Sequence, residues 1–145
     1  MIRHTFVIWE HDWIVRAYFA VNGYWADEIL GHLQRIGADM DVMRSAAKNL
    51  RSGQLNTGLT YTSPWNRETI MVVARASSGA EFFNSLLHEM KHLEEQIGTA
   101  EGIDPKSEEA AYFRGGIARE IYPHIRHLLP CEETLHLPAL RAFNM

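Results

Sequence analysis

The run Ile70-Met71-Val72-Val73-Ala74 constrains the fold more than any other stretch of the chain, because it is apolar on both faces of a strand. Such a strand must lie inside a sheet and be covered on each side. The predicted elements follow the order strand, strand, helix, helix, and the same order then repeats. We therefore predict an α+β fold, with a small, mainly antiparallel sheet packed on helices, in a single domain that spans residues 1–145.

Four runs predict the strands. Residues 5–9 and 13–21 are rich in β-branched and aromatic residues and predict a hairpin, and residues 59–62 and 69–76 predict a second pair around a Ser-Pro-Trp-Asn turn. Two short amphipathic helices lie between the pairs, each followed by a glycine suited to a C-cap. Their predicted apolar faces are Trp25, Ile29, Leu33 and Ile36 in the first helix, and Met40, Met43, Ala47 and Leu50 in the second.

Two longer helices are predicted in the last third of the chain. The first covers residues 80–97 and ends at Gly98. The second begins at Asp104-Pro105, an N-cap followed by proline at the first helical position, and runs to about Tyr122. Pro123 then ends or kinks this helix.

Charge and cysteine content exclude several classes of protein. The formal net charge of −4 offers no broad basic surface, so we expect no nucleic-acid partner. A single cysteine, Cys131, allows no internal disulfide and is typical of a reducing compartment. No signal-peptide pattern begins the chain, and no run approaches the roughly 20 apolar residues needed to span a bilayer. These features predict a cytoplasmic protein without a membrane partner.

Residues 88–92 read His-Glu-Met-Lys-His, which has the spacing H-E-x-x-H. On a helix, His88 and His92 lie one above the other on one face and can bind the same tetrahedral zinc ion. Glu89 lies about 100° further round the helix, which favours the role of a base toward water at the open position of the metal over that of a ligand.

The helical wheel tests whether these histidines belong to the core. Neither His88 nor His92 shares the apolar stripe of its predicted helix, which disfavours core packing. Metal binding and a merely solvated face remain as alternatives. The stripe consists of Phe82, Phe83, Leu86, Leu87, Met90, Leu93 and Ile97.

A catalytic zinc ion needs a third protein ligand. Glu108 and Glu109 open the next predicted helix and lie off its apolar face. Gly115-Gly116 in that helix would permit close approach to a neighbouring helix, at some cost in helix stability. The alternative is that both glutamates only stabilise the helix, through the interaction of their negative charge with the positive end of its dipole.

This pattern, an HExxH helix followed by a glutamate at the start of the next helix, resembles the gluzincin group of zinc metallopeptidases. The resemblance covers roughly residues 69–120, and small single-domain, minigluzincin-like members, including phage and mobile-element peptidases, are similar in size. It implies a zincin-like fold in which His88, His92 and either Glu108 or Glu109 bind zinc, and Glu89 is the general base. It also implies that the strand at residues 69–76 borders the cleft and pairs with an extended substrate.

The chain departs from the family pattern in two respects, a missing aspartate and the lack of a clear match to the family's transition-state stabiliser. Many gluzincins have an aspartate four residues after the glutamate ligand, where this chain has Tyr112 or Phe113. Tyr112 is the first choice as stabiliser of the developing oxyanion, ahead of Tyr122, His124 and His127. Cys131 could be an inhibitory fourth ligand, which would make the enzyme latent.

The sequence therefore predicts a zinc-dependent metallopeptidase, with one Zn²⁺ per chain and a peptide or protein as substrate. Two alternatives remain open. One is a non-catalytic module, stabilised by metal, that binds a partner as an accessory protein of a phage or mobile element. The other is an α+β binding domain in which the motif is a coincidence. The oligomeric state is not indicated.

Overall fold

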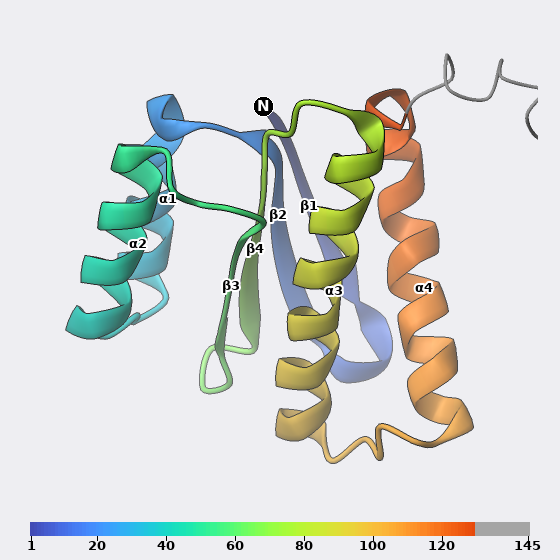
Figure 1. Ribbon diagram of the computed structural model, residues 1–145. Coiled ribbons are helices and arrows are strands. Elements are labelled where there is room, and N and C mark those ends of the chain that lie inside the picture. Colours follow the sequence, from blue (N-terminus) through green and yellow to red (C-terminus); the bar gives the residue numbers. More distant parts are fainter. Residues whose placement is uncertain (130–145) are drawn as a thin grey trace, which may run out of the picture.

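The computed structural model describes residues 1–129 and contains one mixed four-stranded sheet with four α-helices (Figure 1). The strands are β1 (Ile2–Ile8), β2 (Trp13–Val21), β3 (Gly58–Ser63) and β4 (Glu68–Ala74). The helices are α1 (Ala26–Arg35), α2 (Met40–Ser52), α3 (Gly79–Glu101) and α4 (Glu108–Ile125). Short 3-10 turns lie at Trp9–His11, Gly23–Trp25 and Arg126–Leu128. The predicted α+β class and order of elements are confirmed.

The strand order is β1-β2-β4-β3, so β4 is an inner strand. β1 pairs antiparallel with β2, β3 pairs antiparallel with β4, and the central pairing of β2 with β4 is parallel. Every residue of β4 is buried, as the apolar run Ile70–Ala74 predicts. The sheet edge beside α3 is therefore β3, and the prediction that residues 69–76 border a cleft as an edge strand is wrong. The peptide groups of an inner strand are already hydrogen-bonded to the two neighbouring strands, so they cannot pair with a substrate.

The sheet lies between two pairs of helices (Figure 1). On one face, Trp13, Phe19 and Met71 pack with Leu93 and the buried residues of α3 and α4. On the other face, residues of α1 and α2 pack against Tyr18, Ile70 and Val72, at alternate positions of the same strands. They also pack against Val21, which lies on this face because the register of β2 shifts after Phe19. The period of two along each strand thus separates two cores, one on each face.

The first two helices bury the faces that their periodicity predicts, with one exception. Ile29, Leu33 and Leu50 are almost fully buried, whereas Met40 is 75% exposed because it is the first residue of α2. Gly53 ends α2 in the left-handed conformation, as expected of a C-cap glycine. Within residues 1–129, no helix combines the length and the apolar character needed to cross a membrane.

The ends of the last two helices differ from the prediction. Gly98 lies inside α3, which continues to Glu101 and ends at Gly102 with a positive φ of 72°. Ser107, not Asp104, caps α4, because its side chain accepts a hydrogen bond from the Ala110 amide. Asp104-Pro105 instead belongs to the connecting loop, and Pro123 is accommodated inside α4. Gly98 and Asp104-Pro105 were predicted to mark helix ends, but the backbone of Gly102 and the side chain of Ser107 form the actual caps.

Candidate metal site on helix α3

The orientation of α3 about its own axis is set by its apolar stripe. Ser78 caps the helix by accepting a hydrogen bond from the Glu81 amide. Leu86, Met90, Leu93 and Ile97 are then buried against the sheet and α4. Since each residue advances about 100° round the helix, this stripe fixes the direction of every other side chain of α3.

The two histidines of the motif lie together on the exposed surface of α3. The Nε2 atoms of His88 and His92 are 3.2 Å apart, and the ring planes are inclined by 73°. Both residues are solvent-exposed. The sequence-based prediction that they lie outside the core is confirmed.

The distance between the two Nε2 atoms suits a shared metal ion. Zinc binds imidazole nitrogen at about 2.0–2.1 Å with tetrahedral angles, which places two nitrogen ligands about 3.3 Å apart. The separation of 3.2 Å between the His88 and His92 nitrogens agrees with this value. The same separation also suits a hydrogen bond between one protonated and one unprotonated ring nitrogen. Two of the ligands that a zinc ion requires are therefore suitably arranged.

Glu89 points in a different direction from the histidines. It is only 2% exposed, and its carboxylate lies between α3 and β3. The Thr57 hydroxyl donates to Oε2 at 2.8 Å, and the Thr60 hydroxyl donates to Oε1 at 2.8 Å. The two threonines thus compensate for burial of the carboxylate, which is held in the α3–β3 interface.

Glycine at position 58 permits this close packing of β3. Gly58 has a φ of 151°, and a Cβ atom there would lie 1.9 Å from the Val72 carbonyl oxygen and 3.0 Å from Cγ of Glu89. Any side chain would therefore collide with the β4 backbone and press on the glutamate. Thr57 and Thr60 carry no sequence signal that would identify them as partners of Glu89. An isolated glycine at the start of a strand is a weak signal of close backbone approach.

The two flanks of α3 face different neighbours. Gln96 donates from its side-chain amide to the Thr60 carbonyl oxygen at 3.2 Å, so its flank faces β3. Glu94 accepts from Nε of Arg114 at 2.8 Å, so its flank faces α4. His92 lies about 40° from Gln96 but about 200° from Glu94 round the helix. The histidine pair is therefore directed to solvent on the β3 side, away from α4.

This arrangement does not bring Glu108 or Glu109 to the histidines. Glu109 and Tyr112 line a groove between α4 and β1, on the flank of α4 that faces away from α3. Glu108 is exposed at the first position of α4, beyond the end of α3. Within residues 1–129, no three His, Cys, Asp or Glu side chains converge as a group able to hold a metal. The third ligand remains a prediction.

The other residues considered for the site lie elsewhere. Tyr112 and Tyr122 are 78% and 56% exposed on α4. His124 stacks on His4 of β1 with ring centroids 3.5 Å apart, which makes it part of the β1–α4 contact. His127 lies in the 3-10 turn after α4. Cys131 lies outside the described residues, so its predicted role as a fourth ligand stays untested.

No protein-family model, curated protein or solved structure matches this chain. The geometry of α3 and its two flanks therefore provides the main indication of function. That geometry provides two aligned imidazoles, a buried glutamate beside an edge strand, and no converged third ligand among residues 1–129.

Proposed function

We propose that this chain is a zinc-dependent peptidase of zincin-like design, with one zinc ion bound by His88 and His92. The observation that carries the proposal is the 3.2 Å separation of their Nε2 atoms on an exposed helix face. A zinc ion bound there would supply Lewis acidity, polarising a peptide carbonyl and acidifying a water molecule. Glu108 or Glu109 can complete the ligand set only if the first turn of α4 moves, and Glu95 lies nearer on the exposed stripe of α3 itself.

Glu89 is the proposed general base, and the residues around it hold its carboxylate in place to accept a proton. Each carboxylate oxygen accepts one threonine hydroxyl and has capacity for a second hydrogen bond. The two threonine hydroxyls hold the carboxylate at the α3–β3 boundary. The base would therefore act from the β3 side of the histidine pair, where a substrate lying along β3 would pass.

The free edge of β3 favours a peptide as substrate. The Thr57 carbonyl accepts from the Ala74 amide, and the alternation of antiparallel pairing then directs the peptide groups of Thr60 and Thr62 away from β4. Gln96 already donates an amide N–H to the Thr60 carbonyl, as an added strand would. An extended peptide could replace this contact and pair with β3.

The decisive experiment measures zinc in purified protein by elemental analysis. We expect about one zinc per chain, lost in His88→Ala and His92→Ala and retained in Lys91→Ala, whose exposed side chain lies between the two histidines in the sequence. A wild-type protein that takes up no zinc in zinc-replete buffer would overturn the proposal. Parallel measurements on Glu95→Gln, Glu108→Gln and Glu109→Gln would identify the third ligand from the fall in zinc affinity.

Catalysis is tested separately with Glu89→Gln. The variant should keep its zinc but lose hydrolysis of an unfolded protein such as reduced casein by at least about a hundredfold. Hydrolysis that survives this substitution would exclude Glu89 as the base.

One observation favours a second function, a metal-stabilised binding module without catalysis. Glu89 is 2% exposed, and both of its oxygens already accept hydrogen bonds, which is typical of a structural carboxylate. In that case the protein would bind zinc and melt at a lower temperature after chelation, yet hydrolyse nothing.

A further inference from the structure

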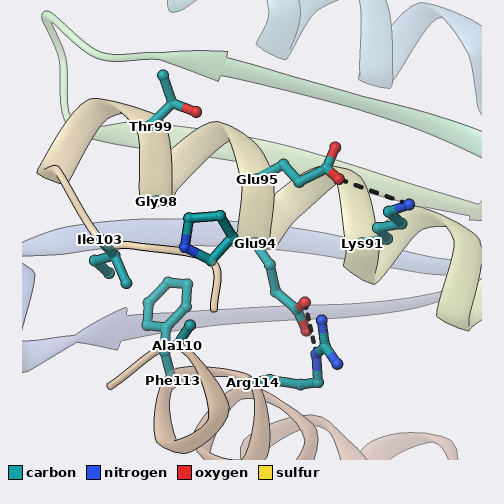
Figure 2. A pocket seen from close by; sticks show the side chains of 10 residues that line it. Lys91, Glu94, Glu95, Gly98, Thr99, Ile103, Ala110, Phe113 and Arg114 are labelled. Atoms are coloured by element: carbon teal, nitrogen blue, oxygen red, sulfur yellow. Dashed lines mark hydrogen bonds and ion pairs between the residues drawn. The ribbon is translucent and has the colours of Figure 1, made fainter. Parts of the chain in front are cut away.

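A cavity of about 380 Å³ lies between the C-terminal half of α3 and the first turns of α4 (Figure 2). Ile103, from the connecting loop, and Phe113, from α4, provide apolar surface on its inner side. Lys91, Glu94, Glu95 and Arg114 provide charged groups along its wall. This combination of an apolar floor and a charged wall is typical of a pocket for a small amphipathic molecule.

Glu94 is the charged group most withdrawn from water in this cavity. Its side chain is 12% exposed, whereas the side chain of Arg114, which donates to it through Nε, is 69% exposed. The largely buried carboxylate is therefore paired with a long side chain that is itself mostly in contact with solvent.

The second ion pair at the cavity, Lys91 with Glu95, leaves the charge inside the cavity negative. Lys91 Nζ lies 3.7 Å from Glu95 Oε1, and the two side chains are 70% and 57% exposed. Figure 2 shows this pair along α3, separate from the Glu94–Arg114 pair that spans the two helices. Lys91 and Glu95 balance each other at the surface, so the buried charge that a ligand meets is the carboxylate of Glu94.

We propose that this cavity binds a small organic cation, a primary ammonium group joined to a compact apolar group. The ammonium replaces the Arg114 guanidinium on Glu94, and the apolar group packs against Ile103 and Phe113. An anionic ligand would have to displace Glu94 from Arg114 and leave a buried carboxylate without a partner. Glu94, which would hold the ammonium, is not among the proposed zinc ligands, so this inference does not rest on zinc binding.

The test titrates benzylammonium into the full chain and follows amide chemical shifts by nuclear magnetic resonance. Benzyl alcohol and benzoate, which share the ring but not the positive charge, are the matched ligands. We expect benzylammonium to bind about tenfold or more tightly than either, with shifts centred on the cavity residues. Equal binding of benzyl alcohol, or tighter binding of benzoate, would overturn the proposal.

Three variants identify the group responsible. Glu94→Gln should weaken benzylammonium binding by about tenfold or more, whereas Glu95→Gln should change it by less than about threefold. Arg114→Gln removes the competing cation and should strengthen binding. Glu94→Gln protein with a native-like spectrum and unchanged affinity would show that the cavity does not recognise the cation through this carboxylate.

Discussion

The two flanks of α3 each hold a largely buried carboxylate, but they compensate for it in different ways. On the β3 flank, Glu89 accepts two neutral hydroxyls from Thr57 and Thr60. On the α4 flank, the charged partner of Glu94 among residues 1–129 is Arg114, which is itself mostly exposed. The β3 flank is closely packed around Gly58, whereas the α4 flank leaves a cavity. Two glutamates five residues apart on one helix therefore differ mainly in the neighbour that covers each.

The largest expected effect concerns the close packing of the β3 flank. Gly58→Ala should cost about 3 kcal/mol or more in the free energy of unfolding, because its Cβ would overlap the Val72 carbonyl oxygen. The measurement is a urea unfolding curve. Gly53→Ala is the matched control: its φ is 73° and no atom lies within 4 Å of the added Cβ, so it should cost only about 1 kcal/mol. Equal losses in the two variants would show that β3 does not pack as closely as described.

A smaller effect is expected when the hydroxyls on Glu89 are removed. The double variant Thr57→Val, Thr60→Val should lose about 2–4 kcal/mol, because the buried carboxylate loses both of its hydroxyl donors. Thr62→Val removes a bond between two neutral hydroxyls and should cost about 1 kcal/mol. Adding Glu89→Leu to the double variant should restore part of the loss. No recovery would argue that the threonines stabilise β3 independently of Glu89.

The smallest effect is a change in pH dependence on the α4 flank. The pKa of Glu94 in the folded protein is raised above 4.5, mainly by burial. The folded state therefore binds this proton more tightly than the unfolded state does. The contribution of Glu94 to stability is present in full below about pH 4.5 and is lost as pH rises through the folded pKa.

Unfolding of wild type and Glu94→Gln should therefore be compared across this range. Wild type should lose stability relative to the variant as pH rises through the folded pKa, whereas Glu95→Gln, altered at a 57% exposed side chain, serves as the control. A wild-type protein that gains stability relative to Glu94→Gln over the same range would show that Arg114 outweighs burial.

Much of the fold followed from periodicity and turn residues. The hairpin, the inner position of Ile70–Ala74 and the two helix pairs were each predicted from local patterns. The local patterns did not predict where the last two helices end and begin, or that Met40 at the start of α2 is exposed. Gly98 and Asp104-Pro105 resemble boundary signals, but Gly102 and Ser107 form the actual caps. Several residues in succession could terminate a helix, and packing of the last turn selects among them.

The sequence by itself determined the exposure of His88 and His92, because the apolar stripe of α3 sets the direction of each side chain. Only the tertiary structure decided what covers each flank of that helix. It placed β3 over Glu89, α4 beside Glu94, and Glu109 on the far side of α4. The reason is that helical phase is a local property, whereas the neighbour at a given angle depends on sheet order and helix docking, which join residues far apart in the chain.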